Sequence, residues 1–173
     1  MSNFTFGKVT PETILKSISC KEDGFAKTFI SKCNMMNALE EVTGLYVEEE
    51  LASMILVTVS KRMPYCANLQ LLHTFYKYRN MGYATTLVFK EFDEIYDIAE
   101  YFRVSSEPNA VGFYRKIGFK FWGKQKSGDY LSLFKIKGIS ISGGLYEKNE
   151  YVISQLFSGR RGSLVEEFDS GPI

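Results

Sequence analysis

The sequence predicts a mixed α/β fold, with a mostly antiparallel central sheet and helices on both of its faces. Two observations carry this prediction. Short runs rich in β-branched and aromatic residues alternate with longer stretches of helical periodicity. Their order along the chain is a strand, two helices, three strands, a helix, a strand, a short helix and two strands.

Composition sets the limits of this fold. A chain of 173 residues, 45% of them apolar and 15% aromatic, is the size of one domain with a tail and can bury a substantial core. The net charge of +1 excludes a strongly basic nucleic-acid coat. We expect a domain over residues 1–138 and a C-terminal extension over 139–173, whose apolar residues pack on the domain or on a second subunit of a homodimer.

Cysteine and histidine usage bears on compartment and metal. Three widely spaced cysteines (Cys20, Cys33 and Cys66) and one histidine give no Cys/His zinc pattern. Unpaired thiols suit a reducing cytosol. No apolar run is long enough to span a bilayer, and the N-terminus lacks the pattern of a signal peptide. The sequence therefore predicts a cytoplasmic protein that needs no membrane and no metal.

The first helix has the clearest start signal. Thr10 offers a capping hydroxyl, Pro11 fits the first helical position, and Glu12 places an acid in the positive first turn. We expect this helix to end near Ser19, after a short strand over 4–8. A second helix is expected over 24–41, where apolar residues recur near one face: Phe25, Phe29, Cys33, Met36 and Leu39.

Three consecutive strands, expected to be antiparallel, follow the second helix. They cover residues 45–47, 54–59 and 68–75, and are rich in β-branched and aromatic residues. The acidic run 48–50 and the segment 61–64, which contains a proline, have the composition of turns or loops.

The second half contains the most regular helix, expected over 85–101 with Val88, Phe92, Ile95 and Ala99 on its apolar face. A strand is expected over 102–105. A short helix follows from Pro108 to Gly118, where glycine can adopt the left-handed conformation that ends a helix. Two strands complete the domain, over 119–122 and 130–136.

The loop Arg79-Asn80-Met81-Gly82-Tyr83-Ala84 lies between a strand and a helix. Gly82 allows the backbone to approach a ligand closely, and a helix start offers unpaired N–H groups and a positive dipole end. Such amides can hold a pyrophosphate without a metal. The loop lacks the Gly-Lys-Ser/Thr ending of a Walker motif. On these residues alone, an ordinary strand-to-helix turn remains the alternative.

A second motif lies downstream, and together the two resemble the GNAT superfamily, the acetyl-CoA-dependent N-acetyltransferases. Arg79-x-x-Gly82-x-Ala84 resembles the pyrophosphate loop of that family. Ala110-x-x-Phe113-Tyr114-x-x-Ile117-Gly118-Phe119 resembles its Ala-x-x-Phe-Tyr-x-x-Leu-Gly-Phe segment. The resemblance covers roughly residues 4–137 and says nothing about the tail. It implies a sheet whose fourth and fifth strands splay apart to admit the pantetheine arm.

The resemblance also implies roles for individual residues. Acetyl-CoA would be the co-substrate, and the acetyl group would pass to a primary amine of a small molecule or protein by direct attack in a ternary complex. Backbone groups of Leu72, His73 and Thr74 would contact the arm. Tyr114 matches the tyrosine that protonates the departing thiolate. The pyrophosphate loop would comprise Arg79, Asn80, Met81, Gly82, Tyr83, Ala84 and Thr85.

The sequence departs from the family pattern in two places. Glu107 stands where the family usually has an asparagine that touches the CoA arm; its carboxylate could instead cap the next helix or act as a base. No carboxylate occupies the strand positions of a general base. Under the resemblance, strand alternation directs Asn68 and Gln70 toward the acetyl group, and we expect them to order a water that relays the amine proton. The alternatives are an acid from the tail or the acceptor loop, or an acceptor that needs no strong base. His73 is expected on the opposite face as a hydrogen-bonded core residue.

Two other functions stay open. One is a catalytically silent module that binds acyl-CoA or a partner. The other is a nucleic-acid base-modifying transferase of the phage type with the same fold. Five basic residues within one acid-free segment could form a positive rim for an acidic ligand, or could simply be solvated: Arg115, Lys116, Lys120, Lys124 and Lys126.

Overall fold

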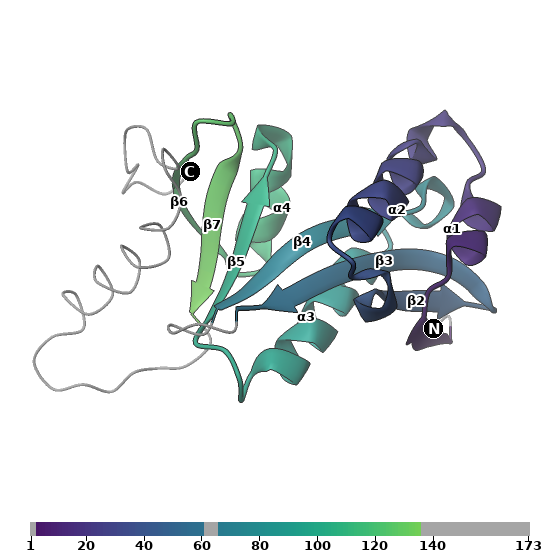
Figure 1. Ribbon diagram of the computed structural model, residues 1–173, viewed down its shortest axis with the longest axis horizontal. Coiled ribbons are helices and arrows are strands. Elements are labelled where there is room, and N and C mark those ends of the chain that lie inside the picture. Colours follow the sequence, from purple (N-terminus) through teal and green to yellow (C-terminus); the bar gives the residue numbers. More distant parts are fainter. Residues whose placement is uncertain (1–2, 61–65, 136–173) are drawn as a thin grey trace, which may run out of the picture. The chain divides into compact units, whose positions relative to one another are not determined.

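The computed structural model describes residues 3–60 and 66–135 (Figure 1). The strands are β1 (Phe4–Lys8), β2 (Thr43–Val47), β3 (Glu50–Val59), β4 (Cys66–Thr74), β5 (Tyr101–Ser106), β6 (Lys120–Lys124) and β7 (Tyr130–Lys135). The α-helices are α1 (Pro11–Ser17), α2 (Phe25–Met35), α3 (Tyr83–Ile95) and α4 (Val111–Lys116). Short 3-10 turns are η1 (Lys21–Asp23), η2 (Leu39–Glu41), η3 (Tyr76–Tyr78) and η4 (Pro108–Ala110). The loop expected at 61–64 and the extension at 139–173 lie outside the described residues.

The strands form one sheet in the order β1-β2-β3-β4-β5-β7-β6. The pairs β1–β2, β2–β3, β5–β7 and β6–β7 are antiparallel, while β4 and β5 are parallel. The predicted fold class is therefore confirmed. The described residues divide into two compact units, unit 1 (residues 3–58 and 69–94) and unit 2 (residues 59–60, 66–68 and 95–135).

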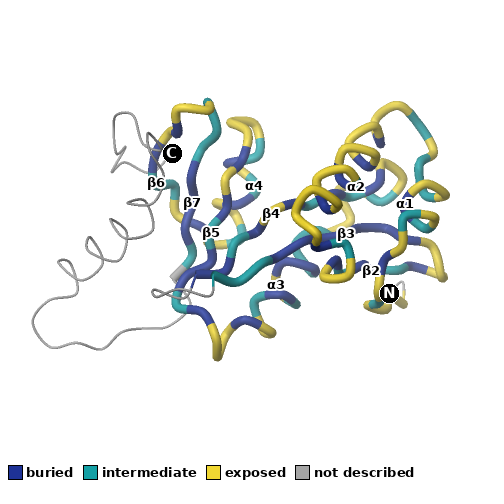
Figure 2. The backbone as a smooth tube through the Cα atoms, viewed as in Figure 1, coloured by how far each residue is buried: buried dark blue, intermediate teal, exposed yellow. Residues whose placement is uncertain are grey.

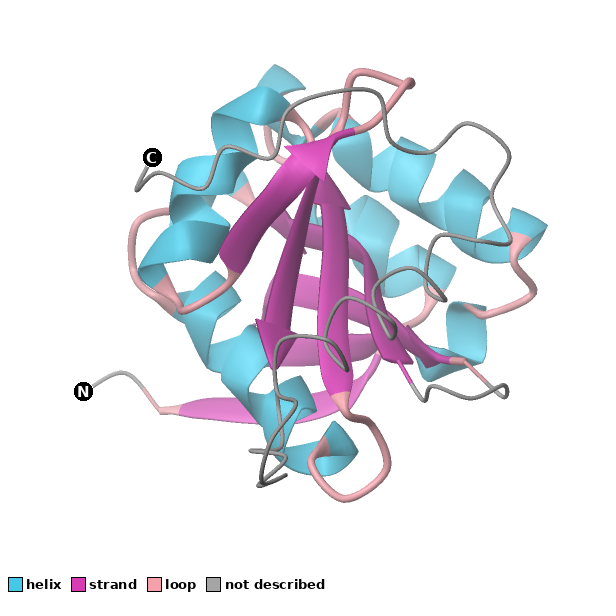
Figure 3. Ribbon diagram, turned by 90° about the vertical axis from the view of Figure 1, so that its left-hand side faces the viewer, coloured by secondary structure: helices cyan, strands magenta, loops and turns pink. Residues whose placement is uncertain are grey.

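In unit 1, helices cover both faces of the strands. Helices α1 and α2 lie on one side of β3 and α3 on the other (Figure 1), and helices are seen on both sides of the strands in Figure 3. Ile14 of α1 and Phe29 of α2 are fully buried against Met54 and Leu56 of β3. Figure 2 shows the same pattern as a buried stretch along β3, where every residue from Leu51 to Val57 is buried. Apolar burial of this kind is the main force that stabilises the unit.

The predicted cap of the first helix is confirmed. The Thr13 backbone N–H donates to the Thr10 hydroxyl at 3.2 Å, and Pro11 occupies the first turn. The second helix ends earlier than predicted, at Met35. Asn37 has a left-handed backbone (φ 50°), and the Ala38 N–H closes the helix end on the Cys33 carbonyl at 3.0 Å. Asparagine tolerates this conformation better than most residues, so it ends the helix where the apolar pattern alone would continue.

Strand β3 begins four residues earlier than predicted because the acidic run forms a tight turn. Glu48 and Glu49 both have positive φ (50° and 70°), as in the two-residue turns that join antiparallel strands. Glu50 already pairs with Val47. Acidic residues are unusual in this turn, which explains why the sequence suggested a longer loop.

Helix α3 ends at Ile95, six residues short of its predicted end. The last turn contains no basic residue, and Asp93 and Glu94 lie at the negative end of the helix dipole. Ala99 and Tyr101 are nevertheless buried, in the segment that leads into β5. The apolar residues that suggested a longer helix therefore pack in a turn and a strand.

The glycine at the end of α4 has the predicted role. Gly118 has φ 109°, and the Phe119 N–H donates to the Tyr114 carbonyl at 3.0 Å, which closes the helix. A Cβ atom at Gly118 would lie 2.6 Å from the Phe134 ring. Both the backbone conformation and the close packing therefore require glycine here.

Candidate functional site

The predicted phosphate loop is an open backbone turn at the start of α3, within unit 1. Asn80 and Gly82 have positive φ (61° and 83°), and the intervening Met81 is 60% exposed. A Cβ atom at Gly82 would meet nothing within 4 Å. The first turn of a 13-residue helix leaves N–H groups without carbonyl partners and carries the positive end of the dipole. Such a turn can bind an anion through main-chain amides, so the fold accommodates the predicted pyrophosphate site.

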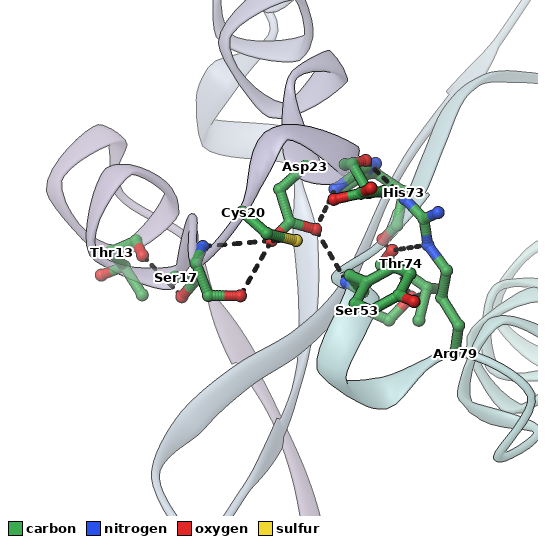
Figure 4. A network of polar contacts seen from close by, with 11 residues as sticks. Thr13, Ser17, Cys20, Asp23, Ser53, His73, Thr74 and Arg79 are labelled. Carbon is green, nitrogen blue, oxygen red and sulfur yellow. Dashed lines mark hydrogen bonds and ion pairs between the residues drawn. The ribbon is translucent and has the colours of Figure 1, made fainter.

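The loop is joined at its base to a buried carboxylate that the sequence analysis missed. Asp23 of η1 is fully buried, and its oxygens accept hydrogen bonds from the Tyr76 N–H (2.7 Å) and from the Ser19 N–H and hydroxyl (3.1 and 3.2 Å) (Figure 4). Burial acts to raise the pKa of Asp23, but the hydrogen bonds from Tyr76 and Ser19 outweigh it and lower the pKa overall. Asp23 is therefore an ionised anchor between the α1–α2 segment and the residues after β4.

Arg79 joins the same two regions. Its Nε donates to the Thr74 carbonyl at 3.1 Å, and its Nη2 donates to the Glu22 carbonyl at 2.8 Å. The guanidinium also lies over the Tyr76 ring, 5.6 Å from its centroid. Two of the five donors of this side chain are thus engaged with backbone carbonyls of unit 1.

His73 is a core residue, as predicted, but it differs from the prediction in its bonding. It is 5% exposed, and its ring contacts Phe75 and Phe25. Its Nε2 lies 3.8 Å from Asp23 Oδ1, and among the described residues no group forms a hydrogen bond with this nitrogen. Burial, aided by the charge of Arg79, lowers the pKa of His73 to about 4. The imidazole is therefore neutral at physiological pH.

The side chains along β4 alternate as the sequence predicted. From Asn68 to Thr74 the odd-numbered residues Leu69, Leu71 and His73 are buried, whereas the even-numbered residues are half-buried or exposed. The Thr74 hydroxyl lies 2.8 Å from the Ser53 hydroxyl, which also donates to the His73 carbonyl at 3.0 Å. His73 thus lies on the opposite face from Thr74 and Leu72.

The two amides predicted to order a water have partners of their own. In unit 1, Gln70 is exposed, and its Nε2 donates to the Thr58 hydroxyl at 2.9 Å. In unit 2, Asn68 accepts from the Arg103 Nε at 2.7 Å and donates to the Cys66 carbonyl at 3.4 Å. Each side-chain oxygen keeps at least one lone pair that can accept a further hydrogen bond.

Tyr114, the predicted general acid, lies on α4 of unit 2. It is buried, and its ring packs edge-on against Phe113 and Phe119 (centroids 5.0 and 5.6 Å apart). Burial raises the pKa of Tyr114 well above its usual range. The phenol therefore remains protonated throughout the physiological range, as a proton donor must.

The residues between β5 and α4 correct one expectation. Glu107 is the N-cap residue of η4, but its exposed carboxylate makes no capping hydrogen bond, so the capping prediction is wrong. The helical turn is instead closed by the Ala110 N–H, which donates to the Glu107 carbonyl. Beside it, the buried Ser106 hydroxyl has no hydrogen-bond partner within the described part of the chain. A buried hydroxyl without a partner is costly unless a ligand supplies one.

Unit 1 also contains a cavity of about 520 Å³ that no predicted site residue lines. Its walls come from α1, from the β2–β3 turn and from the segment after β4. Glu50 accepts hydrogen bonds there from Lys77 (2.6 Å) and Tyr78 (2.5 Å). These three side chains satisfy one another, so the cavity has no evident charge preference.

Three further properties bear on function. All five basic residues of segment 115–126 are exposed. Across 3–60 and 66–135, no group of three or more His, Cys, Asp or Glu side chains could hold a metal ion. Over the same ranges, no helix combines the length and apolar character needed to cross a membrane.

The family model of the acetyltransferase (GNAT) domain matches residues 10–137, which include both sequence motifs. No curated protein sequence matches the chain.

Several solved structures share the fold. Ard1 from Thermoplasma volcanium has a TM-score of 0.60 at 14% identity, over 78% of this chain and 99% of that one. The PaiA N-acetyltransferase from Thermoplasma acidophilum, solved in complex with coenzyme A, has a TM-score of 0.60 at 17% identity (77% and 99% covered). The ribosomal-protein-S18-alanine N-acetyltransferase from Escherichia coli has a TM-score of 0.57 at 16% identity (80% and 99% covered).

Proposed function

Because the chain belongs to the GNAT acetyltransferase family, we propose that it binds acetyl-CoA and transfers the acetyl group to a primary amine. The observation that carries this proposal is the turn at Asn80–Gly82, which is open and precedes the helix start expected to hold a pyrophosphate. The coenzyme A complex of the PaiA N-acetyltransferase, which shares the fold, supports the choice of cofactor.

In this proposal unit 1 supplies the binding groups. Main-chain N–H groups over Asn80–Thr85 would hold the pyrophosphate, with no metal required. Backbone groups of Leu72, His73 and Thr74 would contact the pantetheine arm. The hydroxyl of Ser53 and the guanidinium of Arg79 bind two carbonyls of this segment and fix its course. Bound acetyl-CoA supplies an activated thioester for attack by the amine.

Unit 2 would supply the general acid. The Tyr114 phenol would donate its proton to the sulfur of CoA as the carbon–sulfur bond breaks. Its raised pKa keeps the proton available at every pH at which an amine acceptor is free to react. Ser106, the last residue of β5, and Glu107, which follows it, would contact the CoA arm, and the unpartnered hydroxyl of Ser106 supports such a contact.

The amine proton must leave without a strong protein base. His73 is a poor base, because its pKa is about 4 and it lies on the opposite face of β4 from Thr74. We infer that a water held by the free lone pairs of Gln70 and Asn68 carries the proton away. The transfer rate should then rise with pH as the amine itself deprotonates. The pH–rate profile should show no additional rise near pH ~6.5, where a histidine of ordinary pKa would titrate.

The experiment is a transfer assay on the full chain. Acetyl-CoA is incubated with a panel of small primary amines, peptides with free N-termini and lysines, and an oligonucleotide, and the products are identified by mass spectrometry. Acetylation of an amine supports the proposal. Binding of acetyl-CoA without any transfer would indicate a silent module, and modification of the oligonucleotide alone would indicate a base-modifying enzyme.

The proposal extends to the compartment and the assembly. The three cysteines Cys20, Cys33 and Cys66 are all free thiols, which supports a cytoplasmic location. For the 139–173 extension the proposal keeps both alternatives, packing on its own domain or on a second subunit of a homodimer, and the molar mass of the full chain in solution distinguishes them.

A further inference from the structure

Two hydrogen bonds connect the segment that precedes the phosphate loop to a distant part of the chain. The Tyr76 N–H donates to Asp23 Oδ1 at 2.7 Å, and Arg79 Nη2 donates to the Glu22 carbonyl at 2.8 Å. The partners are 53 and 57 residues apart in sequence, and all lie in unit 1. Together these bonds hold both ends of η3, the turn that leads into Asn80.

Asp23, at the α1–α2 end of these hydrogen bonds, is itself firmly held. Asp23 is fully buried, and its second oxygen accepts from the Ser19 N–H and hydroxyl and from the Cys20 thiol (3.7 Å) (Figure 4). A buried carboxylate is stable only when such bonds satisfy it, so its position is strongly determined. The bond to Tyr76 is charge-assisted and short, which makes it the stronger of the two connections.

Arg79 is the second connection. Its Nε binds the Thr74 carbonyl, at the end of β4, while its Nη2 binds the Glu22 carbonyl, beside Asp23. One planar group therefore fixes the end of the strand and the α1–α2 segment at once. Lysine cannot reproduce this pair of bonds, because it is a single point charge without the fork geometry of arginine.

We propose that Asp23 and Arg79 are positioning residues for the phosphate loop, and that Arg79 acts through its two backbone hydrogen bonds rather than as a phosphate ligand. This inference rests on the proposed function. The two residues form a strut between the α1–α2 segment and η3. The strut holds Asn80 and Gly82 in their left-handed conformations, so that the helix N–H groups are arranged before the ligand arrives.

For the change in coenzyme A affinity on substitution of Asp23, the strut predicts the opposite sign to simple electrostatics. Coenzyme A is a polyanion, so replacing the Asp23 carboxylate by a neutral amide should strengthen its binding if charge alone mattered. The strut predicts weaker binding, because asparagine cannot accept hydrogen bonds at both of its side-chain atoms. For Arg79, a charge role predicts that lysine substitutes well, and the strut predicts that it does not.

The test measures coenzyme A affinity by calorimetry for the full chain and four variants. We expect Asp23→Asn, Arg79→Lys and Arg79→Gln each to weaken binding about tenfold, the scale of one lost charged hydrogen bond. Lys77→Gln is the matched control. It removes the same charge from the same turn, but Lys77 binds Glu50 and not the α1–α2 segment. We expect its affinity to stay within about twofold of the wild type, since surface pairs contribute little.

Kinetics and salt dependence separate positioning from folding defects. In the Arg79 variants the KM for acetyl-CoA should rise while kcat is retained, and the dependence of coenzyme A affinity on salt should keep the wild-type slope. A phosphate ligand would lose part of that slope on substitution by glutamine. Wild-type affinity in Arg79→Lys, or tighter binding in Asp23→Asn, would overturn the proposal.

Hydrogen exchange of the ligand-free chain tests the strut independently of coenzyme A. The Tyr76 amide should exchange faster in Asp23→Asn than in the wild type or in Lys77→Gln. Unchanged exchange would refute the strut itself. If the wild type binds no coenzyme A but this exchange still rises, the proposed function fails and the strut remains as a structural connection only.

Discussion

The two units of this protein would contribute to one reaction in different ways. In unit 1 the candidate phosphate loop is exposed; its donors would be main-chain amides, and the buried hydrogen bonds of Asp23 would hold its shape. In unit 2 the candidate acid is a single phenol, Tyr114, packed among aromatic rings. Binding would therefore depend on backbone conformation, while catalysis would depend on one side-chain atom.

This difference determines how each unit responds to mutation. If main-chain amides hold the ligand, side chains of the loop should change with little effect, unless the change alters the backbone at Gly82 or removes the Asp23–Arg79 strut. If Tyr114 is the general acid, no change at its hydroxyl should be tolerated, whereas phenylalanine should preserve the packing of its ring. Substitutions in unit 1 should therefore change the affinity for acetyl-CoA, and substitutions at Tyr114 in unit 2 should change the rate of transfer.

The largest effect is expected from Tyr114→Phe. Removing the phenol should lower kcat by ~10²- to 10⁴-fold, the usual range for a general acid, with acetyl-CoA affinity unchanged. Steady-state kinetics and calorimetry measure the two quantities. Tyr101→Phe, at another buried tyrosine of unit 2, is the control and should keep its kcat. An unaltered kcat in Tyr114→Phe would remove this residue from the mechanism.

The next effect concerns stability in acid and arises in unit 1. The folded-state pKa of His73 is lowered to about 4, so the unfolded chain binds one more proton between pH ~6.5 and 4. The contribution of neutral His73 to the free energy of unfolding is therefore fully present above pH ~6.5. It is lost as the pH falls toward 4, by on the order of 3 kcal/mol. His73 is the only histidine in the chain, so His73→Gln should remove this dependence from chemical denaturation measured across that range.

Glu91 provides the matched control for this prediction. It is buried on α3, and burial raises its pKa above the usual value of 4.5. A raised carboxylate pKa acts in the opposite direction, because the folded state then binds more protons and loses stability as pH rises. In Glu91→Gln the free energy of unfolding should therefore fall more steeply with decreasing pH than in the wild type. If the free energy of unfolding of the wild type does not change between pH ~6.5 and 4, and does not fall more steeply in Glu91→Gln, the assignment of a neutral, buried His73 is contradicted.

The smallest effect is expected at Ser106 in unit 2. Its hydroxyl has no partner in the described chain, so Ser106→Ala should leave the free energy of unfolding unchanged or slightly higher. If acetyl-CoA supplies the missing partner, the KM for acetyl-CoA should rise about fivefold, the effect of one neutral hydrogen bond. Ser105→Ala breaks the 2.6 Å bond to Gln125 and should show the reverse pattern, with lower stability and the same KM.

The sequence revealed the local parts of both units and missed what joins distant segments. The cap at Thr10, the helix end at Gly118 and the alternation along β4 each depend on neighbouring residues, and all three are confirmed. Helix α3 was predicted too long because burial of Ala99 and Tyr101 resembles helical periodicity.

The Asp23 network could not be predicted in the same way. The role of Asp23 gave no signal in the sequence, because Tyr76, the partner that connects it to the residues after β4, lies 53 residues further along the chain. Only Ser19 and Cys20 are local partners. The Ser106 hydroxyl without a hydrogen-bond partner could not be predicted either, since the lack of a partner is a property of the folded chain. The long-range hydrogen bond of Asp23 and the missing partner of Ser106 could therefore be found only in the structure.

The most direct test is the affinity for acetyl-CoA of the wild type and two glycine variants. Gly82 and Gly128 both have positive φ (83° and 95°) and open space around a new Cβ atom, so alanine imposes comparable backbone strain at each. Only Gly82 lies in the proposed phosphate loop. We predict that the wild type and Gly128→Ala bind acetyl-CoA alike and that Gly82→Ala binds at least about tenfold more weakly while remaining folded. Equal affinity in all three proteins, or no binding by the wild type, would contradict the proposed site.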